Sequence, residues 1–119
     1  MVAKRIVACL DVIDGRVVKA RLVIGADGKN SFCRKPSAVI GTSPGKIGTA
    51  VGQQHLRSIL AFCNSPQMNS IEAYIQFTPG LINEGGEVTD DSTAEFLRVY
   101  MAEFLAFIGR VYTVLPRNA

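Results

Sequence analysis

The residues best suited to contact a ligand form one short run that links an apolar segment to a helix-like pattern. Glycine lets a ligand approach the backbone closely, and free N–H groups ahead of a helix can bind an anion or an electron-rich ring edge. The same residue types are also typical of a plain strand-to-helix turn. The candidate binding residues of this bend are Thr42, Ser43, Pro44, Gly45, Lys46, Ile47 and Gly48.

No other group of residues predicts catalysis or a metal site. His55 is the single histidine, and it lies in a helical pattern without a neighbouring nucleophile, so we interpret it as structural. The acidic side chains at 84, 87, 90 and 91 fit a solvated loop that leads into a helix. We therefore predict no catalytic residue and no metal ligand among the side chains of this chain.

Cys9, Cys33 and Cys63 are too few and too far apart for a paired framework. Their spacing predicts reduced thiols in a cytoplasmic protein. The net charge of +3 comes from scattered basic residues that form no stripe, which argues against nucleic acid as a partner. No apolar run is long enough to cross a membrane, so we expect no membrane partner. With 119 residues, we predict a single domain over 1–119.

The elements that must position the bend follow from hydrophobic periodicity. Residues 4–12 and 17–24 read as two strands around Asp14-Gly15, which predicts an N-terminal β-hairpin in a head of residues 1–34. The apolar run 37–41 predicts a central parallel strand that is covered on both faces. The segment 49–62 carries one apolar stripe and predicts a helix that ends before Asn64-Ser65-Pro66.

The remainder of the chain predicts a strand over 71–77, a loop over 78–90 and a long final helix. Ser92, with Glu95 three residues later, suggests a capping box for that helix. The order of elements predicts an α/β fold, with a β/α/β/α half over 35–119 and a sheet of three to five strands. Because half a sheet leaves an open edge and an apolar helix face, we expect either the hairpin or a homodimer, with exchanged elements as one form, to cover them.

The segment KPSAVIGTSPGKIGTAVGQQHLRSIL, residues 35–60, resembles the NAD(P)H-dependent FMN reductase family, which includes chromate and quinone reductases. It is similar to the fourth strand, the flavin-facing loop and the following helix of that family. The resemblance continues through IEAYIQF and GLINEGGEVTD to the final helix, over about 35–115. It implies a partial flavodoxin-like three-layer fold in which residues 42–48 contact the isoalloxazine ring of FMN. It also implies that the helix and the strand after it form the oligomer contact.

The sequence departs from that family at two of its three flavin-contacting loops. The phosphate loop, a Gly-Ser-x-Arg-x-x-Ser turn, is missing, and so is the Pro-Glu-Tyr-Asn loop beside the flavin. Phosphate capture at a helix N-terminus supplies much of the anchoring of such a cofactor. If FMN binds, we therefore expect weak binding. Early in the helix, Val51 and Gln54 replace the charged and aromatic residues that the family leads one to expect.

The head resembles two other families. AKRIVACLDVIDGRVVKA, residues 3–20, is similar to the first strand and hairpin of the cyclase subunit of imidazole glycerol phosphate synthase, in which the aspartate at Asp11 is catalytic and Lys19 lies nearby. VKARLVIGADGKNS, residues 18–31, resembles a GADG element of FAD monooxygenases, in which Asp27 contacts flavin. Each family needs further motifs that are absent here, so neither activity is predicted.

Three unrelated resemblances in one chain suggest a composite origin, either engineered or recombined. Two functions follow. The first is an NAD(P)H-dependent FMN reductase-like flavoprotein with quinone or chromate reductase activity, in which FMN carries the redox chemistry. The second is a non-catalytic folded module with no native ligand. Whether the chain is an enzyme is not decided by its residues.

Overall fold

The computed structural model describes residues 11–13, 16–19 and 32–116, and for the first two ranges it describes the backbone only. β1 (Asp11–Ile13) and β2 (Arg16–Lys19) pair in antiparallel fashion, with Ile13 opposite Arg16. The predicted hairpin is therefore confirmed, and its pairing is irregular between Asp11 and Val12. Cys9, the GADG element and its Asp27 lie outside the described residues.

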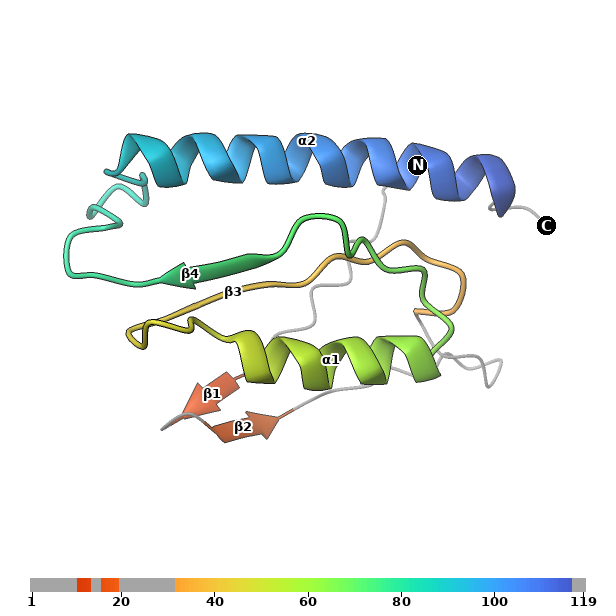
Figure 1. Cartoon of the computed structure of the whole chain (residues 1–119), viewed down its shortest axis with the longest axis horizontal. Coiled ribbons are helices and arrows are strands. Elements are labelled where there is room, and N and C mark those ends of the chain that lie inside the picture. The colour runs from red at the N-terminus through yellow and green to blue at the C-terminus, as the bar shows by residue number, and fades with distance from the viewer. Residues whose placement is uncertain (1–10, 14–15, 20–31, 117–119) are drawn as a thin grey trace.

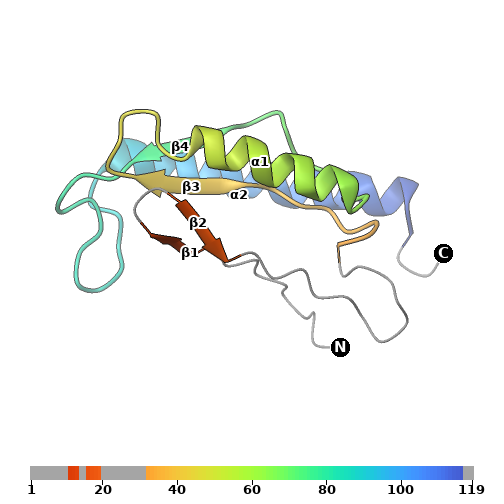
Figure 2. The ribbon, with the colours of Figure 1, turned by 90° about the horizontal axis from the view of Figure 1, so that it is seen from below.

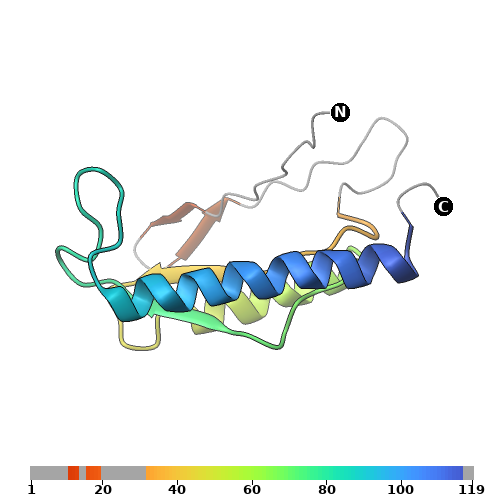
Figure 3. The same ribbon diagram turned by 90° about the horizontal axis from the view of Figure 1, so that it is seen from above.

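The C-terminal part has three layers. β3 (Ile40–Ser43) and β4 (Ala73–Gln76) run parallel, and α1 (Ala50–Phe62) connects them as the crossover. α2 (Asp91–Val114) follows a loop and crosses the other face of the strands. Figure 1 shows the strands between the two helices, and the views from below and above place α1 and α2 on opposite sides of them (Figures 2 and 3). The predicted α/β class and its β/α/β/α order are confirmed.

The predicted central position of the first parallel strand is wrong within the described residues, although α1 and α2 lie on its two faces. Within the described residues the sheet has two strands, not three to five, and the hairpin forms a separate two-stranded sheet. The strand also begins later than predicted, because Ser37 makes only an isolated bridge to Gln67. Among the described residues no strand lies beside β3 on the side away from β4, and Ile40 remains 47% exposed. The hairpin therefore adds no strand to the β3–β4 pair.

The core between the strands and α2 centres on Tyr100. Its side chain is 2% exposed and packs with Met68 and Ala73. The Tyr100 hydroxyl donates a 2.8 Å hydrogen bond to the carbonyl of Val39, just before β3. Burial raises the pKa of Tyr100, an effect that the charge of Arg57 partly offsets, so the hydroxyl keeps its proton and stays a donor. This bond fixes α2 against the start of β3.

The capping box predicted for α2 is wrong, because the helix starts two residues earlier. Asp90 is the N-cap, and its carboxylate accepts hydrogen bonds from the Thr93 N–H and from the Ser92 hydroxyl at 2.7 and 2.6 Å. Glu95 pairs with Arg98 instead of reaching back to the cap. Aspartate satisfies the first free N–H groups and also complements the helix dipole, so it is the stronger cap here.

We predict that Asp90 makes stability depend on pH in the acidic range. The hydrogen bonds from Ser92 and Thr93 lower the pKa of Asp90 from 3.8 to about 2. Because this pKa lies below that of the unfolded chain, the contribution is present above pH 3.8 and is lost as the pH falls toward 2. The urea midpoint should therefore fall less steeply over this window for Asp90→Asn than for the original chain. Glu84→Gln is the control, and equal slopes for all three proteins would contradict the cap.

Candidate functional site

The bend after β3 is held in one shape by its own residues. The Ser43 hydroxyl donates a 2.6 Å hydrogen bond to the carbonyl of Gly48, and the Gly48 N–H donates to the carbonyl of Gly45 at 2.9 Å. Thr42 and Ser43, which we predicted as part of the bend, are the last residues of β3. The structure therefore keeps all seven predicted residues together and divides them between a strand end and a closed turn.

Gly48 allows the bend to lie directly on β4. Its φ angle is +57°, a conformation that residues with a Cβ rarely adopt. A Cβ at this position would lie 3.0 Å from the Tyr74 carbonyl carbon and 3.1 Å from the Ile75 nitrogen. Both the backbone angle and the close approach require glycine. The bend is thus fixed by its contact with the neighbouring strand.

A buried glutamine joins the bend to α1 and β4. The Gln53 side chain is 3% exposed, and its Nε2 donates to the carbonyl of Ala73 at 2.8 Å and to the hydroxyl of Thr49 at 2.9 Å. Thr49 packs so closely on β3 that a Cβ on Gly41 would lie 2.0 Å from its Oγ1. The sequence reasoning missed Gln53 and Gly41. The sequence did contain a signal for Gln53, because this polar residue shares one helix face with the apolar residues Leu56 and Leu60.

The top of the bend offers free backbone donors. Among the hydrogen bonds of the described residues, none uses the N–H of Gly45, Lys46 or Ile47. These three residues are exposed, and Ile47 has 66% of its surface accessible. They lead directly into α1, whose first turn carries no acidic residue. Consecutive free N–H groups ahead of a helix give a site of positive potential that suits an electron-rich ring edge or an anion.

Two loops meet at the same end of the sheet, because β3 and β4 are parallel. The N–H of Phe77 donates to the carbonyl of Ser43, and Gln76 Nε2 donates to the carbonyl of Pro44, at 2.8 and 3.1 Å. The loop that follows β4 is closed by an antiparallel bridge between Ile82 and Val88. In open α/β sheets, ligands bind outside the carboxyl ends of the strands. The predicted residues lie at that end.

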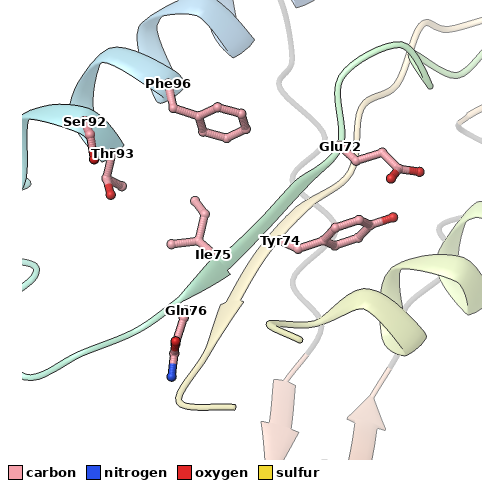
Figure 4. Close-up of a pocket in the computed structure, with 7 residues that line it drawn as sticks. All are labelled: Glu72, Tyr74, Ile75, Gln76, Ser92, Thr93 and Phe96. Carbon is pink, nitrogen blue, oxygen red and sulfur yellow. The ribbon is translucent and has the colours of Figure 1, made fainter. Parts of the chain in front are cut away.

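A hollow in the described surface lies elsewhere. It measures about 460 Å³ and opens along the free edge of β4, where Ile75 faces Phe96 of α2 and Tyr74 points toward α1 (Figure 4). Its lining residues are Glu72, Tyr74, Ile75, Gln76, Ser92, Thr93 and Phe96. No residue of the bend lines it, and Gln76, which does line it, donates to the carbonyl of Pro44 in the bend. We place the candidate site at the bend, because three consecutive backbone N–H groups are free there among the hydrogen bonds of the described residues.

The other side chains considered in the sequence do not assemble into a catalytic group. His55 is exposed on α1. Arg57 reaches the Met68 carbonyl and Asn69, and its Nε and Nη2 are buried without a partner in the described part. Gln54 bonds the Tyr74 hydroxyl at 3.1 Å. Asp11 is the cross-strand partner of Lys19, and the side chains of both lie outside what the structure describes.

The cysteines and the acidic side chains were the remaining candidates for a disulfide or a metal site. Cys63 is buried and Cys33 half-buried, and both are free thiols. Over 32–116 and the two described strands of the head, no cluster of three or more His, Cys, Asp or Glu side chains could hold a metal. In the same residues, no helix has both the length and the hydropathy that a membrane crossing requires.

Comparison with known proteins relates part of this chain to reductases. The chain is 36% identical over 81 residues to a 2-hydroxy-1,4-benzoquinone reductase of Burkholderia sp.. It is 30% identical over 80 residues to an NAD(P)H-dependent FMN reductase of Pseudomonas aeruginosa. Among solved structures, the flavoenzyme FerB, an NAD(P)H:(acceptor) oxidoreductase from Paracoccus denitrificans, superposes with a TM-score of 0.66 at 40% identity. The C-terminal part of this chain is homologous to NAD(P)H-dependent FMN and quinone reductases.

The reductase-like part accounts for only a portion of each relative. The match covers 68% of this chain and 44% of the Burkholderia reductase, and it covers 72% of this chain and 47% of FerB. The chain thus spans somewhat less than half the length of the relatives it matches. No family model matches it. The predicted reductase resemblance and flavodoxin-like half are confirmed.

We predict that Gln53 holds the site together and that its neighbour does not. Gln53→Met keeps the size of the side chain but leaves the buried Ala73 carbonyl and the Thr49 hydroxyl without their donor, at a cost of about 1–3 kcal/mol. Gln54→Met is the matched control, because Gln54 bonds an exposed hydroxyl on the same helix. Urea unfolding measures both. Equal losses for the two variants would contradict the role given to Gln53.

Proposed function

We propose that the reductase-like part binds the isoalloxazine ring of FMN at the bend of residues 42–48, as one side of a flavin reductase site. The observation that supports this most strongly is the set of free N–H groups on Gly45, Lys46 and Ile47 at the carboxyl end of a parallel sheet. When bound, FMN supplies the redox chemistry of an NAD(P)H-dependent quinone or FMN reductase. The names of the homologous proteins describe that activity.

The free N–H groups of the bend fit the electron-rich ring edge of FMN. Gly45 presents its N–H without a side chain, and a Cβ at this position would meet only the Ser43 hydroxyl, at 3.7 Å. Lys46 and the N-terminus of α1 favour the negative charge that a reduced flavin ring carries. The phosphate loop of the family has no counterpart in the sequence. We therefore propose weak binding, with this chain orienting the ring and no side chain acting as acid or base.

The alternative is a folded module without a native ligand. The two missing flavin loops support it, because the bend alone leaves the phosphate in water. We further propose that the chain is composite, since the similarity to reductases covers 68% of it and the head resembles other families. A cytoplasmic location remains a prediction. FMN binding separates the two functions directly.

We predict saturable quenching of FMN fluorescence by the purified chain, with a weaker affinity for Gly45→Val. Valine at 45 fits without disturbing the turn and covers the free N–H groups, so the affinity should fall at least about tenfold. Gly48→Val is unsuitable, because it would displace the bend from β4. The control is Gly109→Val in α2, where a Cβ meets nothing within 4 Å. Absence of quenching at high FMN concentration favours the ligand-free module.

Self-association through α1 is also proposed. One side of this helix carries three exposed apolar residues, namely Val51 (60% exposed), Ile59 (46%) and Phe62 (90%). Three exposed apolar side chains on one helix face are typical of a contact with another protein. The family resemblance implies an oligomer contact through the same helix and the strand after it. We infer a homodimer in which the α1 helices of two copies pack together.

We predict that Phe62→Glu converts this dimer into monomers, because each copy would then bury a charge at the contact. Mass in solution, measured by light scattering over a range of concentrations, reports the change. Val114→Glu is the control, since Val114 is 78% exposed on α2. A monomeric original chain, or a dimer that Phe62→Glu leaves intact, would remove the α1 contact from the account.

A further inference from the structure

The two-stranded sheet has an unpaired edge at β3, and the flavodoxin-like fold indicates which strand normally lies beside that edge. Among the described strands, β3 pairs with β4 alone. The flavodoxin-like strand order is 2-1-3-4-5, so the last two strands are neighbours and the third strand lies beside the fourth. Because the reductase-like part is a C-terminal half, β3 and β4 take the places of the fourth and fifth strands. The free edge of β3 is therefore the place of the third strand.

α2 carries an exposed apolar stripe on the same side as this edge. Successive residues of a helix are rotated by about 100°. One apolar line along α2 therefore consists of Leu97, Met101, Leu105 and Ile108. It lies next to the line of the helix that holds the buried Tyr100. Met101 and Leu105 are 57% and 71% exposed.

The direction in which the apolar stripe of α2 points follows from the position of Phe96, on the other side of the helix line that holds Tyr100. Phe96 lies on the other side of the buried line and lines the hollow at the free edge of β4 (Figure 4). The stripe therefore points past β3, away from β4. The stripe lies over the space beside the free edge of β3. Among the described residues, no segment covers the stripe.

Ile40 continues this surface onto the sheet. Side chains alternate between the two faces of a strand. A Cβ on Gly41 would point at Thr49, at the start of α1, so Gly41 faces α1 and Ile40 faces α2. Ile40 is 47% exposed there, beneath the stripe and next to the free edge. We call Ile40, Leu97, Met101, Leu105 and Ile108, together with the free edge of β3, the β3–α2 face.

We propose that the β3–α2 face is a docking surface for the first half of a flavodoxin-like reductase, supplied by a second polypeptide. This chain matches 44% of the Burkholderia reductase and 47% of FerB. Because it resembles the fourth strand of the family and the elements after it, we infer that the unmatched part of those relatives holds the first three strands. A third strand would continue the parallel sheet along β3, and a helix beside it would cover the stripe. Parallel sheets of this type are covered on both faces.

A second copy of this chain fits the same surface less well. In a twofold dimer that keeps both α2 helices on one face of a joint sheet, the two β3 strands run antiparallel. Two C-terminal halves also repeat the same strands and supply no third strand. The missing half would instead bring the flavin loops that this sequence lacks. That last consequence rests on the proposed function, whereas the association itself does not.

Co-expression tests the docking directly. The full chain is produced together with a tagged segment of the Burkholderia reductase, namely the part of that protein that this chain does not match. We expect the tagged half to remain soluble and to retain the full chain in a 1:1 molar ratio, with a mass by light scattering that matches a 1:1 complex or, where the α1 contact also forms, a 2:2 complex. Leu105→Glu should weaken the complex at least tenfold. Val99→Glu is the matched control, because Val99 is 50% exposed on α2 but outside the stripe.

The outcomes separate the docking from the flavin proposal. A complex in a 1:1 molar ratio that Leu105→Glu weakens and Val99→Glu does not supports the docking whether or not it is yellow. A colourless complex would contradict the FMN proposal alone. The docking is overturned if the tagged half stays insoluble or fails to retain the chain, or if Leu105→Glu leaves the complex intact. It is also overturned if Leu105→Glu turns a homodimer of the chain alone into monomers, because the occupant is then a second copy.

Discussion

The parallel pairing of β3 with β4 is the constraint on which the rest of the structure depends. Because the two strands run in the same direction, the chain must cross back between them, and α1 makes that crossover on one face of the sheet. The same pairing brings the bend and the loop after β4 to one end. Gly48 can then rest on the β4 backbone, and Gln76 can hold the carbonyl of Pro44. The candidate site is a consequence of this pairing.

The order and type of the elements could be predicted because they depend on local patterns. The helix predicted over 49–62 begins one residue later, at Ala50, and the strand predicted over 71–77 contains β4. The features that failed depend on partners distant in sequence. A central position for β3 requires a second neighbouring strand, which the described residues do not provide, and Ile40 stays 47% exposed. The N-cap of α2 was misplaced because Asp90 and Ser92 are both suitable caps, and only the geometry distinguishes them.

The position of the site followed from residue types, but its construction did not. A glycine-rich run after an apolar segment indicates a bend, and the seven predicted residues do lie together. The pattern could not distinguish Gly48, which must be glycine, from Gly45, which leaves space for a side chain. It also gave no role to Gln53, whose two hydrogen bonds join three segments. These roles arise only when β4 is placed beside β3.

The central claim is that the backbone of the bend contacts the flavin ring, and amide chemical shifts test it most directly. Adding FMN to the isotopically labelled chain should shift the N–H signals of Gly45, Lys46 and Ile47 and those of the first turn of α1. Signals of α2, such as that of Gly109, should stay in place. Shifts confined to the hollow around Ile75 and Phe96, or no shifts at all, would contradict the account.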